Sequence, residues 1–110
     1  MEKTALEILT TADMLLDSEE HWIKRSLREP KGLVFSYCLL GAVVYSAGGN
    51  TVDRLRNSLP LNIALEKANL AVRKLGYGDS SLSEFNDAES TTFRDVKTVL
   101  ARAIEMVKRL

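Results

Sequence analysis

The segment SYCLLGAVVYSA, residues 36–47, decides the fold because it is the most apolar stretch of the chain. Two interpretations compete for it. Its β-branched and aromatic residues favour a strand, whereas its length and the glycines that follow, Gly48 and Gly49, favour a buried helix. No obvious partner strand lies nearby, so we predict a helix. Gly41 lies inside this helix, and we expect a close helix crossing to explain a glycine there.

Helical patterns extend from this segment toward the N-terminus. Residues 4–20 place apolar side chains at the three- and four-residue spacing of an amphipathic helix. Thr4 is placed to cap that helix, with Glu7 as the reciprocal partner of a capping box. Residues 21–29 predict a second short helix that stops at Pro30, where the EPKG sequence predicts a tight turn.

Helical patterns also follow the segment. Residues 51–59 predict a short helix capped by Thr51. The next helix has Pro60 in its first turn, shows one apolar face and is closed by Gly76. A loop follows by composition, and the last helix begins at about Phe93.

Together these patterns predict an all-α fold. We expect a compact single domain over residues 1–110, a bundle of four to five helices around the 36–47 helix. The chain has 110 residues, near the common size of one domain. Apolar residues make up 45% of the sequence, which is enough for one core.

Composition argues against several classes of partner. Fifteen basic residues balance fifteen acidic ones, so the basic excess that is typical of nucleic-acid binders is missing and no nucleic acid is expected. No apolar run approaches the roughly 20 residues that span a bilayer, and the N-terminus lacks the pattern of a signal peptide. We therefore expect a cytoplasmic protein without a membrane segment.

The residues available for catalysis are few. Cys38 is the only cysteine and His21 the only histidine, so neither a multi-cysteine zinc site nor a pair of imidazole ligands can form within one chain. Cys38 falls in the most apolar segment, where a thiol is usually inert packing. No glycine-rich phosphate loop is present. We predict no catalytic residues, no metal site and no cofactor.

Asn86 and Asp87 are the most ambiguous pair in the sequence. Asn and Asp make Asx turns, and Thr92 can cap the last helix with Asp95 at its third position, so turn chemistry accounts for the whole stretch. The alternative is a polar pair on a binding loop beside Phe85. We favour an architectural role, with Phe85 pinned to the core, and keep binding as the alternative.

Trp22, the only tryptophan, also has two interpretations. It closes the core between the first two helices, or it acts as a stacking surface or partner anchor. Trp22, Asn86 and Asp87 are therefore the candidate residues for ligand or partner binding. Cys38, Gly41, Phe85, Thr92 and Asp95 are the candidate structural residues.

Three segments, HWIKRSL (21–27), YCLLGAVVYSA (37–47) and FNDAESTTFRDVKTVLARAI (85–104), resemble a small helical family of unknown function from bacteria and their phages. The family shows a tryptophan segment, a C-x-L-G-A helix, a W-N-D-A turn and a threonine-capped final helix. The matching positions are Trp22, Cys38, Leu40, Gly41, Ala42, Asn86, Asp87, Ala88, Thr92, Asp95 and Val96. Phe85 stands where the family usually has tryptophan, and Glu89-Ser90 replaces its Pro-Gly. The resemblance implies a compact helical domain and supplies no activity.

Three classes of function remain. The first is a non-enzymatic interaction protein that binds a partner protein, in a setting of phage–host conflict; a second copy of the chain is a further candidate partner. The second is a binder of a small polar ligand such as a nucleotide, near Trp22 and Asn86-Asp87. The third, a hydrolase or transferase, is disfavoured by the few catalytic residues. A flat apolar patch would favour the first class, and a concave polar pocket the second.

Overall fold

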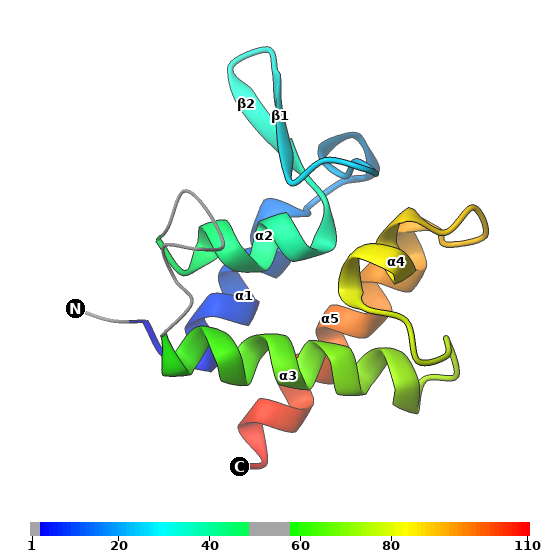
Figure 1. Cartoon of the computed structure of the whole chain (residues 1–110). Coiled ribbons are helices and arrows are strands. Elements are labelled where there is room, and N and C mark those ends of the chain that lie inside the picture. Colours follow the sequence, from blue (N-terminus) through cyan, green and yellow to red (C-terminus); the bar gives the residue numbers. More distant parts are fainter. Residues whose placement is uncertain (1–2, 49–57) are drawn as a thin grey trace.

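Five α-helices and one β-hairpin make up the described part of the chain, residues 3–48 and 58–110, in the computed structural model (Figure 1). The elements in order are α1 (Ala5–Leu15), the 3-10 turn η1 (Glu19–His21), β1 (Arg28–Lys31), β2 (Val34–Tyr37), α2 (Leu39–Ser46), α3 (Leu59–Lys74), α4 (Leu82–Asp87) and α5 (Phe93–Lys108). The predicted helical domain is thus confirmed. The prediction of a purely all-α fold is wrong, because β1 and β2 form a two-stranded antiparallel sheet that stands out from the helices.

The apolar stretch 36–47 contains a junction between a strand and a helix. The helix prediction is confirmed from Leu39 onward and is wrong for Ser36 and Tyr37, which end β2. Cys38 lies between the two elements as the N-cap of α2, and its Sγ accepts a hydrogen bond from the Gly41 N–H. Each competing interpretation was therefore right for one part of the stretch.

The helix predicted over residues 21–29 is absent. This segment leaves η1, bends, and continues into β1, with Arg25 at a left-handed φ of 70°. The strand that was missing from the sequence interpretation is thus supplied by residues that had been assigned to the end of a helix, Arg28 and Glu29, and to a turn, Pro30 and Lys31. The tight turn lies later than predicted, because Pro30 and Lys31 belong to β1 and the loop consists of Gly32 and Leu33.

The geometry of the hairpin loop explains why residue 32 is a glycine. Lys31 pairs with Val34, so the loop has two residues, and Gly32 adopts a φ of +64°. A positive φ at the first loop position, without one at the second, Leu33, is the pattern of a type II′ turn, and glycine fills the first position without strain.

Capping residues set the starts of the other helices. The capping box of α1 is present as predicted, with Thr4 and Glu7 each bonding the other's backbone. Ser58 caps α3, and Pro60 lies in its first turn as predicted. The helix predicted over 51–59 falls outside the described residues except for its end, where Ser58 and Leu59 belong to the start of α3.

One helix was not predicted. Ser81 and Glu84 form a capping box that begins α4, and Asn86 and Asp87 are the last residues of that helix. The prediction that Asn86 and Asp87 form an Asx turn is therefore wrong. The Ser-x-x-Glu spacing at 81–84 was the available signal.

The buried core lies where α1, α2, α3 and α5 meet, and α4 closes it through Leu82 and Phe85. Its largest fully buried apolar side chains are Ile8, Leu9, Leu16, Leu39, Leu61, Leu100, Val43, Val44, Val72, Val96 and Val99.

Lysines from elsewhere in the chain bond the C-terminal carbonyls of three helices. Lys97 donates to the carbonyls of Asp13 and Leu16 at the end of α1, each at 2.8 Å. Lys3 donates to the last carbonyl of α2, and Lys24 donates to the carbonyl of the residue that caps α4, both at 2.8 Å. A cation at the C-terminal end of a helix satisfies carbonyls that lack helical partners and complements the helix dipole.

The capping box of α5 gives a testable prediction. Thr92 Oγ1 accepts from the Asp95 N–H at 3.2 Å, and the Asp95 carboxylate accepts from the Thr92 N–H at 2.9 Å, as predicted. We expect Thr92→Ala to lower the free energy of unfolding by about 1 kcal/mol, the usual cost of a lost N-cap. Urea denaturation measures the change. Thr98→Ala, at an exposed interior position of α5, is the matched control and should cost little; equal losses would mean that Thr92 does not cap.

Candidate functional site

Asn86 is fully buried and uses all four hydrogen-bonding positions of its side-chain amide. Its Oδ1 accepts from Trp22 Nε1 at 2.6 Å and from the Leu39 N–H at 3.0 Å. Its Nδ2 donates to the Ile23 carbonyl and to Asp87 Oδ1, each at 3.0 Å. Because every position is occupied within the chain, the amide has no remaining donor or acceptor for a ligand.

These bonds join three distant parts of the fold at one point. They connect the segment at 22–25, the first residue of α2 and the end of α4. The Leu39 N–H has no partner within its own helix, so the Asn86 amide caps α2 from outside. The half-buried Trp22 ring packs against Phe93, with ring centroids 6.1 Å apart, so the bond also positions the indole.

Asp87 holds the same segment from the other side. Its Oδ1 accepts from the Arg25 N–H at 2.8 Å, at the residue with left-handed backbone. Lys24 bonds the Ala88 carbonyl just beyond α4. These long-range bonds explain why residues 22–27 do not form the predicted helix, since their backbone and side-chain groups bond α4 instead. The structure thus brings Trp22, Asn86 and Asp87 together.

A small cavity of about 160 Å³ lies beside Asp87. Its lining consists of Arg25, Ser26, Leu27, Cys38, Ser83 and Asp87. Neither Trp22 nor Asn86 contributes to it. Small-molecule sites usually enclose about 300 to 1,000 Å³, so this cavity has room for a few waters but not for a nucleotide.

Cys38 and Gly41 have structural roles next to this cavity. Burial raises the pKa of the Cys38 thiol, although the Gly41 N–H that donates to Sγ acts in the opposite direction. The thiol is therefore protonated at neutral pH and is a poor nucleophile. A Cβ on Gly41 would lie 1.9 Å from the Leu27 carbonyl oxygen, so the close approach expected at Gly41 exists. Its partner is the backbone of a bent segment, not a helix.

The residues around the start of α5 also support the fold. Phe85 is buried and packs against Tyr77, with ring centroids 4.9 Å apart. The Tyr77 hydroxyl donates to Asp95 Oδ1 at 2.9 Å. The backbone N–H of Thr92 and then this hydroxyl lower the pKa of Asp95. The carboxylate thus stays ionised in its capping role at neutral pH.

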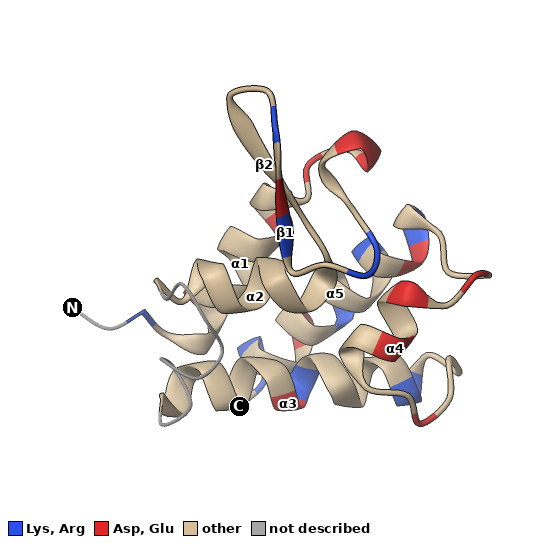
Figure 2. Cartoon of the chain, turned by 45° about the horizontal axis from the view of Figure 1, so that its top comes forward, with Lys and Arg blue, Asp and Glu red and all other residues tan. Residues whose placement is uncertain are grey.

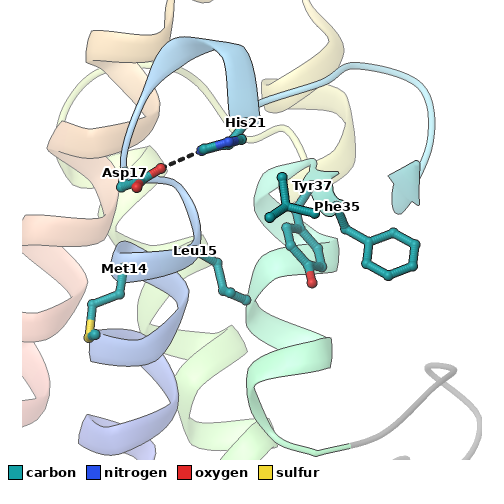
Figure 3. Close-up of a pocket in the computed structure, with 7 residues that line it drawn as sticks. Met14, Leu15, Asp17, His21, Phe35 and Tyr37 are labelled. Carbon is teal, nitrogen blue, oxygen red and sulfur yellow. Dashed lines mark hydrogen bonds and ion pairs between the residues drawn. The ribbon is translucent and has the colours of Figure 1, made fainter. Parts of the chain in front are cut away.

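A second region, absent from the sequence predictions, lies beside the hairpin. A cavity of about 360 Å³ runs between the end of α1 and β2 (Figure 3). Its lining is mostly apolar and consists of Met14, Leu15, Asp17, His21, Val34, Phe35 and Tyr37. Exposed apolar side chains continue from it to the tip of the hairpin, where Leu33 is fully exposed. We call this surface, formed by the cavity lining and Leu33, the hairpin groove.

The polar end of the hairpin groove contains a paired histidine. His21 Nδ1 bonds Asp17 Oδ1 at 2.5 Å, and the dashed line in Figure 3 marks this contact. The hydrogen bond from His21 lowers the pKa of Asp17, so the carboxylate keeps its negative charge. The signal that sequence interpretation missed was Leu33-Val34-Phe35, three apolar residues directly after Gly32.

Two negative findings concern the described residues alone. Within 3–48 and 58–110, no three His, Cys, Asp or Glu side chains come together as potential metal ligands. No helix in the same ranges combines the length and the apolar character needed to cross a membrane.

Comparison with known proteins places the chain in a family. Searches of curated proteins and of solved structures gave no match. A family model described as a family of unknown function (DUF6197) matches residues 1–106, nearly the whole chain. The predicted membership of a family of unknown function is therefore confirmed, and the chain belongs to DUF6197.

Proposed function

We propose that this protein is a non-enzymatic interaction protein whose hairpin groove binds an extended segment of a partner protein. The observation that carries the proposal is a set of exposed apolar side chains on the hairpin and the neighbouring end of α1: Met14, Leu33, Val34 and Phe35. Three of them also line the 360 Å³ cavity. Contiguous exposed apolar surface on a small protein typically marks an interaction site.

The edges of the hairpin differ in what they offer to a partner strand. Along an antiparallel ladder, hydrogen-bonded residue pairs alternate with non-hydrogen-bonded pairs. The pair next to a two-residue loop, here Lys31 and Val34, is a hydrogen-bonded pair. Pro30 and Phe35 are therefore a non-hydrogen-bonded pair whose backbone groups point outward. On the β1 edge the outward residue is Pro30, which has no N–H to donate and so blocks strand addition.

The β2 edge is open to pairing at Phe35. Tyr37, two residues along, faces the same way, and its carbonyl accepts from the Ile23 N–H at 3.0 Å in a parallel bridge with the Trp22 segment. The outward N–H and carbonyl of Phe35 have no such partner among the described residues. An extended segment could continue this edge by strand addition, with an apolar side chain in the cavity.

Charge suggests what else the partner carries. Asp17 lines the groove, and Glu19 and Glu20 lie on η1 next to the hairpin (Figure 2). Glu20 is tied to the strands, because its carbonyl accepts from Lys31 Nζ and from Ser36 Oγ. We therefore propose a partner segment with an apolar residue next to a Lys or Arg.

Selection from a random peptide library tests the proposal. We expect peptides that join an apolar residue to a Lys or Arg, and we expect Val34→Asp to weaken their binding by about tenfold or more, since it replaces an apolar contact of the groove with a carboxylate that binding would have to desolvate. Leu110→Asp is the matched control, because it makes the same change at an exposed apolar side chain of the C-terminus. Titration calorimetry measures both affinities.

Two results would contradict this function. In one, the selected peptides bind the Val34→Asp protein as well as the unchanged protein. In the other, sedimentation shows a dimer of the unchanged protein that Val34→Asp converts to a monomer; the occupant of the groove would then be a second copy of this chain.

A further inference from the structure

A third cavity lies on the opposite part of the bundle, between α3 and α5. It encloses about 460 Å³, within the usual range for small-molecule sites. Among the described residues, four basic side chains line it, Lys67 and Lys74 from α3 and Arg102 and Arg109 from α5, with Glu105 as the only carboxylate. Figure 2 shows basic positions in the middle and at the end of α3. We call this surface the cationic groove.

The charge of the cationic groove is not balanced locally. Four cations face one carboxylate, in a chain whose basic and acidic residues are equal in number. Within the part of the chain that the structure describes, Lys67 pairs only with its neighbour Glu66, at 3.6 Å, a long contact to an exposed side chain. Lys74, Arg102 and Arg109 have no ion pair within the described ranges.

Helix dipoles account for the positions of only two of these four cations. Lys74 ends α3 and Arg109 caps the end of α5, where cations are favoured by the helix dipole. Lys67 and Arg102 lie in helix interiors, more than a turn from either end. Their convergence on the same cavity costs electrostatic repulsion, which a bound anion would relieve.

The apolar part of the lining restricts the kind of anion. Leu70 from α3 and Met106 from α5 are half-buried in the same cavity. A methionine side chain adapts to flat rings and contacts them favourably. Arginine guanidinium groups bind phosphate oxygens in pairs, and lysines add point charges.

We propose that the cationic groove binds a small organic phosphate of the nucleoside diphosphate class. Arg102 and Arg109 bind the phosphates together with Lys67 and Lys74, and the base or sugar contacts Leu70 and Met106. This site is separate from the hairpin groove, so its test does not depend on the proposed partner protein.

Titration calorimetry at fixed ionic strength tests the site with adenosine diphosphate, inorganic pyrophosphate and adenosine. We expect saturable binding of the diphosphate, weaker binding of pyrophosphate, and no binding of adenosine. Lys67→Gln combined with Arg102→Gln should weaken diphosphate binding by at least about tenfold. The matched control combines Arg73→Gln with Arg94→Gln, which removes the same charge from exposed positions of α3 and α5 outside the groove. This control should bind the diphosphate as tightly as the unchanged protein.

Three results would overturn the proposal. They are the absence of saturable binding, equal losses in both double variants, and tighter binding of a single-stranded oligonucleotide than of the diphosphate. The last would assign the groove to a polymeric anion. Circular dichroism checks that each variant is folded, and Arg109→Gln, at an exposed position, replaces the Lys67 and Arg102 variant if that one unfolds.

Discussion

Replacing Asn86 with alanine is expected to lower the free energy of unfolding by about 3 to 5 kcal/mol. The substitution leaves the Trp22 indole N–H, the Leu39 N–H and the Ile23 carbonyl without their partner. A buried polar group left unsatisfied costs about 1 to 3 kcal/mol, and entry of water into the space reduces the sum. Small domains are stable by about 5 to 15 kcal/mol, so this variant should be marginally folded.

Urea denaturation, followed by circular dichroism, measures this loss. Asn62→Ala is the matched control, since Asn62 lies exposed on α3 and the change there should be nearly neutral. Asp87→Ala removes a half-buried side chain, and its loss of unfolding free energy should lie between those of the Asn86 and Asn62 variants. Unchanged stability of the Asn86 variant together with lost ligand or partner binding would refute the architectural role and make Asn86 a binding residue.

Replacing Gly41 with alanine is expected to destabilise the protein by about 2 to 4 kcal/mol, although alanine is the better helix former. Helix propensity alone would stabilise the variant by about 1 kcal/mol. The added Cβ, however, would lie 1.9 Å from the Leu27 carbonyl oxygen and 2.7 Å from its carbonyl carbon. The backbone there must move, and overpacking of this kind typically costs about 1 to 3 kcal/mol or more.

The sign of the change decides this prediction. Ala101→Gly, at an exposed position inside α5, measures the propensity difference in this protein and should cost about 1 kcal/mol. If Gly41→Ala raises the midpoint of thermal unfolding by a similar amount, the close approach of Leu27 does not constrain α2. A lowered midpoint would support the conclusion that the close approach of Leu27 constrains α2.

Local signals in the sequence predicted the parts of the fold that depend on neighbouring residues. The capping boxes of α1 and α5 follow from Thr4-Glu7 and Thr92-Asp95, pairs three residues apart. The apolar periodicity of α3 and α5 likewise needs no distant partner. Gly76, with a φ of +89°, follows the end of α3 as expected of a helix stop.

The parts that could not be predicted depend on contacts between distant residues. Residues 22–27 have helix-compatible composition, yet bonds to Asn86, Asp87 and Ala88 give them another conformation. The segment at 28–31 contains a proline and no β-branched or aromatic residue, and becomes a strand only because β2 pairs with it. The cationic groove combines side chains of α3 and α5, which are far apart in sequence, so no local pattern indicates it. The hairpin groove had one local signal, Leu33-Val34-Phe35, but its cavity also needs the end of α1.

The Asn86 bonds also bear on the lifetime of the folded state. They join residues 47 to 64 positions apart in the chain, to Leu39, Ile23 and Trp22. Contacts of this separation require closure of a long loop, which costs entropy before any bond repays it, so they form late in folding. Interactions that form after the transition state slow unfolding more than they speed folding. We therefore expect the buried Asn86 amide to govern mainly how long the native protein persists, and only weakly how fast it is reached.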